Sequence, residues 1–310
     1  MIIKIANGTN SIAGYLVIFI LWFISGVVGI YEISQGFFLW DLVPLLKVVI
    51  GEIFILITGL ALLYFLARHK FIGMSNTLPA IIYMVFCLGI SVSAGFMKHQ
   101  ISIFMLLLVS ERLVSLHNST HNYLKVFGIG LLLGGLIVIS PSLIGLLFIY
   151  LIGLALVTTF GWRDFIIPLF GIGSVVLFFF TIVYLLDLEV VGYNFNFSYP
   201  KVSVGFTVHK ILLTSISIFE FLFLVKLFAV IEKKNIKSRI HYWIWIWATI
   251  FLFISFLFFQ EEFEKEKLIL FLALPMAIFS TEFFISIKRV FLRELAFVIL
   301  SVLLMCLRIS

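Results

Sequence analysis

The feature that most constrains this chain is the recurrence of long runs of apolar residues. Residues 11–31 read SIAGYLVIFILWFISGVVGIY and hold no charged side chain. An α-helix rises 1.5 Å per residue, so about 20 such residues cross the roughly 30 Å apolar core of a bilayer. Because 63% of the residues are hydrophobic and only 12% are charged, polar surface is too scarce to cover a soluble globule. We therefore predict an all-α, polytopic transmembrane helical bundle that forms a single integral-membrane domain over residues 1–310.

Eleven segments are candidates for helices of this bundle. One of them, 100–114, has an apolar stretch that is short for a span, and it also fits a re-entrant or interfacial helix. We expect about eleven crossings, or ten if 100–114 is re-entrant. The other ten segments are 11–31, 42–67, 78–97, 126–140, 142–160, 166–186, 207–230, 241–259, 268–285 and 294–308.

The loops between these segments differ in charge. Basic residues gather at 68–70, 161–165, 232–241 and 286–293, whereas 260–267 reads QEEFEKEK. Cytoplasmic loops of membrane proteins carry the excess of Lys and Arg. The pattern predicts a cytoplasmic N-terminus, and it places the later basic loops in the cytoplasm only if 100–114 crosses. The pattern therefore predicts a multi-pass membrane protein.

Two acidic residues fall near the middle of apolar segments. They are Glu52 in 42–67 and Glu220 in 207–230. A charge at this depth is costly, so each intramembrane ionisable residue is a candidate functional residue. One hypothesis is a proton or cation site formed by the two carboxylates. The alternative is that each is protonated or hydrogen-bonded to a neighbouring helix and only fixes packing.

Glu32 and Asp41 flank the first loop that we expect outside the cell, in the sequence YEISQGFFLWD. A carboxylate there suits a catalytic base that takes a proton from an acceptor hydroxyl while a lipid phosphate leaves. Acidic residues are also ordinary in an external loop. A catalytic role for Asp41 and Glu32 and a purely solvated role both remain open.

Four cationic or titratable side chains are candidates for binding a phosphate of a substrate. They are Lys47, Arg163, His209 and Lys210. The alternative for each is an interfacial position, because long basic side chains snorkel to the membrane surface and Arg163 also fits a cytoplasmic anchor.

We expect no metal and no cofactor. His117 and His121 have helical i, i+4 spacing, but a zinc site needs three or four ligands and no further ligand set lies nearby. A phosphate-binding loop and a dinucleotide fingerprint are also missing from the sequence. The net charge of +6 comes from short basic loops, so nucleic acid is not an expected partner. The expected partners are membrane lipids, a lipid-linked substrate or other membrane proteins of an envelope pathway.

A central stretch, residues 78–171, carries a family resemblance. Its features are Leu78-Pro79-Ala80, Glu111-Arg112, the glycine-rich run 128–135, Ser140-Pro141-Ser142 and Trp162-Arg163-Asp164. This stretch resembles an uncharacterised family of polytopic inner-membrane proteins from Bacteroidetes-type bacteria. The resemblance implies that the chain is a multi-pass protein of the bacterial inner membrane. The chain is more loosely similar to C-type glycosyltransferases that use polyprenyl-linked sugars, through its many spans and acidic first external loop.

Three functions remain in competition at this level. The first is a noncatalytic inner-membrane protein that serves envelope biogenesis or assembly. The second is a glycosyltransferase-like enzyme that acts on a lipid-linked sugar, with Asp41 or Glu32 as base. The third is a transporter or flippase that uses Glu52 and Glu220. Whether the chain is an enzyme stays open.

Overall fold

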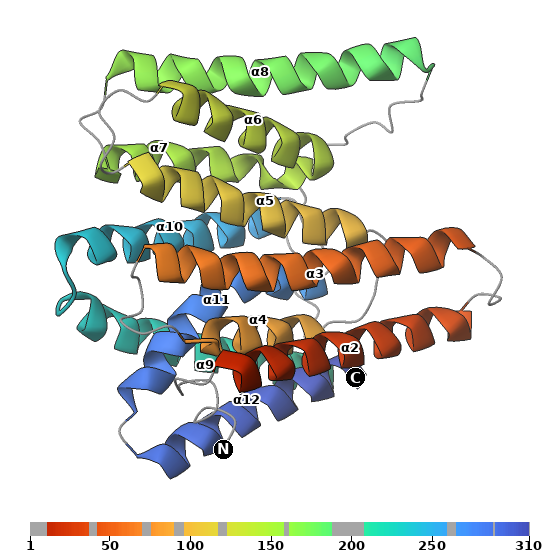
Figure 1. The fold of residues 1–310 in the computed structure, drawn as a ribbon, viewed down its shortest axis with the longest axis vertical. Coiled ribbons are helices and arrows are strands. Elements are labelled where there is room, and N and C mark those ends of the chain that lie inside the picture. Colours follow the sequence, from red (N-terminus) through yellow and green to blue (C-terminus); the bar gives the residue numbers. More distant parts are fainter. Residues whose placement is uncertain are drawn as a thin grey trace. The chain divides into compact units, whose positions relative to one another are not determined.

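A computed structural model describes most of the chain as α-helix (Figure 1). The described residues are 11–36, 42–69, 76–89, 96–116, 123–157, 161–187, 208–258, 265–287 and 289–309. Within these ranges there is no β-strand, which confirms the predicted all-α class. The number of membrane crossings and the orientation of the N-terminus stay predictions.

Eleven α-helices and one short 3₁₀ helix make up the described part. They are α2 (Ser11–Gly36), α3 (Leu42–Arg68), α4 (Leu78–Leu88), α5 (Phe96–Ser115), α6 (Tyr123–Ile139), η2 (Pro141–Gly145), α7 (Leu146–Val157), α8 (Trp162–Leu185), α9 (Val208–Ile231), α10 (Ile236–Phe258), α11 (Lys265–Ser286) and α12 (Val290–Ile309).

The chain divides into two compact units. The first unit comprises residues 1–100, 202–239 and 269–310, and the second comprises 101–201 and 240–268. In the first unit α2, α3 and α12 pack around α4, while in the second α6 packs along α8. The single integral-membrane domain expected over residues 1–310 stays a prediction.

Three helices of the described part are long and apolar enough to cross a membrane. They lie in Ile12–Glu32, Leu45–Arg68 and Trp162–Leu185. The last of these, α8, leaves large apolar side chains such as Phe170, Leu177 and Phe178 exposed. Exposed apolar surface of this extent is typical of an interaction with lipid or with another protein.

The predicted segments 78–97 and 100–114 are wrong in their lengths. The first helix, α4, has only 11 residues and ends at Leu88, with Gly89 as its C-cap, whereas α5 has 20 residues and begins at Phe96. At 1.5 Å per residue α4 is about 16 Å long, which is too short to cross a bilayer core. Every residue of α4 is buried, so the strong hydropathy of this segment reflects a protein core and not a full span.

The glycine-rich run 128–135 explains the close packing of α6 on α8 in the second unit. A Cβ atom added to Gly130 would overlap the backbone of Pro168, and one added to Gly171 would lie 2.7 Å from the carbonyl oxygen of Phe127. Gly130 and Gly134 are four residues apart and therefore share one face of α6. Small residues at this spacing let two helix backbones approach closely, as in membrane helix pairs.

Candidate functional site

Glu52 is the centre of a polar contact between α2 and α3 in the first unit. It is only 4% exposed. The Ser25 hydroxyl donates a hydrogen bond to Glu52 Oε1 at 3.0 Å, and the Trp22 indole donates to the Glu52 backbone oxygen at 2.8 Å. Trp22 and Ser25 are three residues apart, so one face of α2 supplies both donors. The carboxyl thereby ties two adjacent helices together.

The second carboxyl oxygen of Glu52 has a different environment. Oε2 is buried and has no hydrogen-bond partner among the described residues. A buried polar atom without a partner costs free energy, on the order of 1–3 kcal/mol. Glu52 therefore combines one satisfied oxygen with one that can still accept a hydrogen bond or carry a proton.

A cavity of about 200 Å³ lies beside this contact, between α2 and α3. The surface that lines this cavity is apolar. A Cβ atom added to Gly26 would meet nothing within 4 Å, so this glycine leaves the space open. The wall residues are Trp22, Phe23, Gly26, Val27, Ile30, Val48, Val49 and Glu52.

An ion pair joins α2 to α12. Arg308 Nε donates to Glu32 Oε1 at 2.6 Å, and Arg308 Nη1 donates to the carbonyl oxygen of Leu88, the last residue of α4, at 2.8 Å. The Arg308 side chain is only 6% exposed. The Glu52 carboxyl interacts electrostatically with both members of this pair. The Glu52 carboxyl therefore lies within electrostatic range of the Glu32–Arg308 pair in the first unit.

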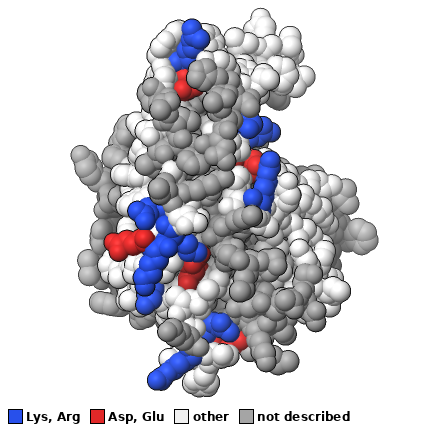
Figure 2. All heavy atoms as spheres, turned by 60° about the vertical axis from the view of Figure 1, so that its left-hand side comes forward, with Lys and Arg blue, Asp and Glu red and all other residues white. Residues whose placement is uncertain are grey.

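A second ion pair holds the turn after α9 against α11. Lys234 Nζ lies 2.9 Å from Glu282 Oε1, and the Glu282 side chain is 6% exposed. Lys234 follows the end of α9 at Ile231, so this pair also links two helical elements of the first unit. Figure 2 shows Lys and Arg spheres next to Asp and Glu spheres in small groups on one face of the molecule.

Of the other candidate residues, the structure describes the side chains of Lys47 and Arg163. Lys47 is exposed on α3, and Arg163 is exposed on the first turn of α8 in the second unit, with its guanidinium carbon 5.4 Å from the Trp162 ring centre. Asp41 lies outside the described residues, as do His117 and His121. Glu220, His209 and Lys210 lie on α9, but their side chains are also outside the described part.

Sequence reasoning missed the partners of the acidic residues. It singled out Glu52 and Glu32 but neither Ser25 nor Arg308. Ser25 is an isolated hydroxyl three residues after Trp22 in an uncharged run, which is a weak signal. Arg308 is 276 residues from Glu32, so no local pattern connects them. Within the described residues no cluster of His, Cys, Asp and Glu has the make-up of a metal site.

These features define an all-helical protein whose long apolar helices are compatible with a membrane and whose first unit is tied together by buried charged side chains. The chain belongs to the family of unknown function DUF6427, whose model matches residues 17–309. No curated protein and no solved structure matches the chain. The expected membership of an uncharacterised family is therefore confirmed, while the Bacteroidetes-type origin and the glycosyltransferase similarity stay predictions.

Proposed function

We propose that this chain is a multi-pass protein of the bacterial inner membrane that serves envelope biogenesis or assembly without catalysing a reaction. Three long apolar helices and the exposed apolar surface of α8 support the membrane placement. Eleven crossings and a cytoplasmic N-terminus belong to this proposal. Its expected partners are membrane lipids and other membrane proteins of an envelope pathway.

One observation carries the noncatalytic role: acidic side chains of the first unit are held by partners on other helices. Glu52 accepts from Ser25, Glu32 from Arg308 and Glu282 from Lys234. Arg308 Nε contacts Glu32 Oε1, so this oxygen already takes part in the link between α2 and α12. Glu32 is therefore better suited to joining these two helices than to contacting a substrate.

A charge-exchange experiment separates this role from catalysis. The gene is deleted in the source bacterium, and the strain is complemented with wild type, Glu32→Gln, Arg308→Glu or the double variant Glu32→Arg/Arg308→Glu. Growth, envelope composition and the amount of the chain in the membrane fraction are measured. We expect the single variants to lose abundance and function together, and the double variant to regain part of both.

If the chain is an enzyme, the charge-exchange experiment should give a different result. If Glu32 is the catalytic base, the double variant regains abundance but no function, since an arginine replaces the base. Glu232→Gln is the matched control, because its side chain is exposed. A chain that is absent from the membrane fraction would contradict the placement itself. The lipid-linked glycosyltransferase alternative, with Asp41 or Glu32 as base, stays a prediction.

A second candidate function is transport, and the buried, unpartnered Oε2 of Glu52 favours it. An intramembrane carboxyl that can gain and lose a proton is the kind of group that proton-coupled transporters use. The purified full-length chain is reconstituted into liposomes, and proton flux is recorded with a pH-sensitive dye. A flux that the chain adds and that Glu52→Gln removes would support transport over the noncatalytic role.

A further inference from the structure

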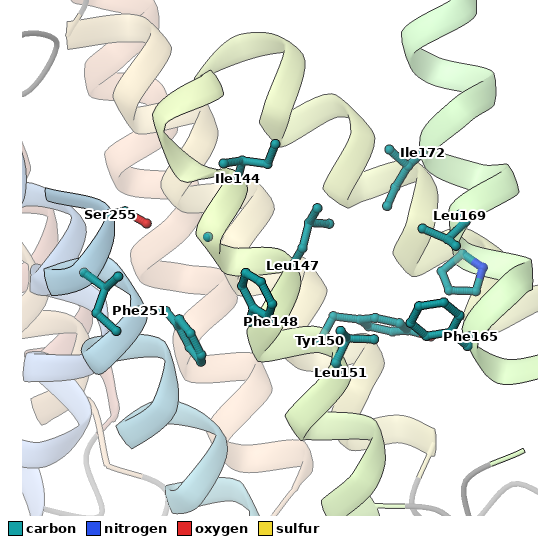
Figure 3. Close-up of a pocket in the computed structure, with 13 residues that line it drawn as sticks. Ile144, Leu147, Phe148, Tyr150, Leu151, Phe165, Leu169, Ile172, Phe251 and Ser255 are labelled. Atoms are coloured by element: carbon teal, nitrogen blue, oxygen red, sulfur yellow. The ribbon is translucent and has the colours of Figure 1, made fainter. Parts of the chain in front are cut away.

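The buried polar groups differ between the two units. In the second unit an apolar pocket of about 580 Å³ is walled mostly by α7, α8 and α10, and none of the described residues that line it is charged (Figure 3). In the first unit, two buried atoms on side chains of opposite charge type have no hydrogen-bond partner among the described residues, Glu52 Oε2 and Arg308 Nη2. A buried charged group with an unsatisfied atom is costly, so these two atoms are the stronger indication of a function.

Arg308 uses two of its three side-chain nitrogens to hold other helices. Nε donates to Glu32 Oε1 of α2 at 2.6 Å, and Nη1 donates to the carbonyl oxygen of Leu88, the last residue of α4, at 2.8 Å. The third nitrogen, Nη2, has no partner among the described residues, although a guanidinium nitrogen at this position carries two N–H donors. The guanidinium therefore fastens the last turn of α12 to α2 and α4 and keeps donors for another acceptor.

Glu52 offers an acceptor of the kind that these donors lack. Ser25 donates to Oε1 at 3.0 Å, which leaves Oε2 without a partner among the described residues. Ser25 and Glu32 are seven residues apart, or two helical turns, so they lie on the same face of α2. The Glu52 carboxyl interacts electrostatically with both Arg308 and Glu32. Two carboxyl groups therefore compete for one guanidinium.

The other helices that pack near Glu52 bring no further charge in the part of the chain that the structure describes. The α4 helix contributes Tyr83 and Cys87, which interact with the Glu52 carboxyl. Both side chains are neutral near physiological pH. The α5 helix places the apolar ring of Phe96 against α3. Arg308 is therefore the cation that acts on Glu52.

The charge of Glu52 decides how strongly it attracts Arg308. A protonated carboxyl is neutral and leaves the guanidinium with Glu32, which matches the observed contacts. An ionised carboxylate attracts the guanidinium, since opposite charges interact strongly where water is scarce. We infer that Glu52 is a proton-binding site and that its proton controls the contact of α12 with α2 through Arg308. When the proton leaves the carboxyl for water, Nη2 turns toward Oε2 and the bond from Nε to Glu32 weakens.

This change is confined to the end of α12. A Cβ atom added to Gly89, the C-cap of α4, would lie 2.7 Å from Leu304 Cβ, so α12 stays packed on α4 one turn before Arg308. The Glu32 side chain is 27% exposed, which opens this end to water. By linkage, whatever moves the last turn of α12 also changes the proton affinity of Glu52. Because no proton has to cross the membrane, this coupling goes beyond the proposed function.

The test places a nitroxide spin label on the purified full-length chain in detergent micelles. Native Cys306 is exposed in the last turn of α12, whereas Cys87 is buried, so the label attaches near Arg308 without a substitution. Electron paramagnetic resonance spectra are recorded at about pH 5 and about pH 9, a range that includes the titration of buried carboxyl groups. We expect the ratio of mobile to immobile label to rise about fivefold or more with pH, which is the lower end of the usual coupling between two sites.

Two variants should remove this pH dependence in opposite ways. Glu52→Gln is neutral at every pH and should keep the label immobile at both pH values. Arg308→Gln lacks the cation and should leave the label mobile at both. Glu232→Gln, at an exposed position, is the matched control and should keep the change seen in the wild type. Gel filtration first checks that each variant elutes as the folded wild type does.

Three results would overturn the inference. A wild-type label that responds to neither pH would show that Glu52 does not control α12. A Glu52→Gln chain that keeps the response would assign it to another group. The third result uses Val290→Cys in a Cys306→Ser chain, which moves the label to an exposed position at the opposite end of α12. An equal response there would show a general loosening of the chain with pH.

Discussion

The helix contacts singled out above differ in kind between the two units. In the first unit, charged and polar side chains cross from helix to helix, as in the contacts of Glu52 with Ser25 and of Glu32 with Arg308. In the second unit, α6 and α8 approach through glycines, with Gly130 against Pro168 and Gly171 against Phe127. The first kind of contact depends on charge and the second on the absence of a side chain.

The two kinds of contact should be sensitive to different substitutions. An ion pair with little access to water is sensitive to the loss of either partner, because the remaining charge stays buried. A close backbone contact is sensitive to the gain of a single methyl group. Substitutions of charged and polar side chains are therefore compared with substitutions of glycines, in order of decreasing expected effect.

The largest effect is expected from Glu32→Gln in the first unit. It leaves the Arg308 guanidinium, which is 6% exposed, without its carboxylate. Removing one partner of a buried pair costs about 3–5 kcal/mol, and the lower end applies because the Glu32 side chain is 27% exposed. Thermal or denaturant unfolding of the purified chain measures the loss. Glu232→Gln, at an exposed position, should stay within about 0.5 kcal/mol.

The next effect belongs to the second unit, in Gly130→Ala. The added methyl group would overlap the Pro168 backbone, and overpacking of this kind costs about 1–3 kcal/mol. Gly128→Ala on the same helix is the matched control, since a Cβ atom there meets nothing within 4 Å. That control should be neutral or stabilising by up to about 1 kcal/mol through helix propensity. Equal responses of the two variants to unfolding would contradict the close packing of α6 on α8.

The contacts of the two units also differ in how far the sequence predicts them. Gly130 and Gly134 belong to the run that sequence analysis singled out, because the spacing that brings them to one face is local. The bonds of Glu32 and Glu52 depend on which helices pack together, and this requires tertiary structure. Sequence reasoning therefore found the two acids without the arginine and the serine that hold them.

Helix positions show the same limit. The segment 42–67 corresponds closely to α3 (Leu42–Arg68), because hydropathy and length agree there. The segment 78–97 does not correspond to one helix, since α4 ends at Leu88. A helix that faces lipid and a helix that is buried in a protein core both have high hydropathy. Hydropathy alone therefore does not distinguish a membrane span from a short helix that other helices surround.

A smaller effect is expected from Ser25→Ala, which removes the hydrogen bond to Glu52 Oε1 and leaves the ion pair intact. Hydrogen bonds between membrane helices contribute about 0.6 kcal/mol on average, up to about 2. We expect a loss of about 1 kcal/mol in unfolding of the purified chain. Thr181→Ala is the control, because its hydroxyl donates only to Leu177 of its own helix. A loss as large in the control would show that α2 and α3 do not depend on this contact.

The smallest effect is expected from Gly26→Ala, which tests a glycine of α2 in the first unit. The new methyl group enters the cavity beside Glu52, where nothing lies within 4 Å, so the free energy of unfolding should change by less than about 1 kcal/mol. Gly14→Ala on the same helix should destabilise the chain, because its Cβ atom would overlap the Thr77 side chain. If Gly26→Ala destabilises as much as Gly14→Ala, the space beside Glu52 is closed and α2 packs on α3 through glycine as tightly as α6 packs on α8. If it does not, Gly14 packs closely against Thr77 while the space beside Glu52 stays open, and the side-chain contacts of Glu52 and Glu32 link α2 to α3 and α12.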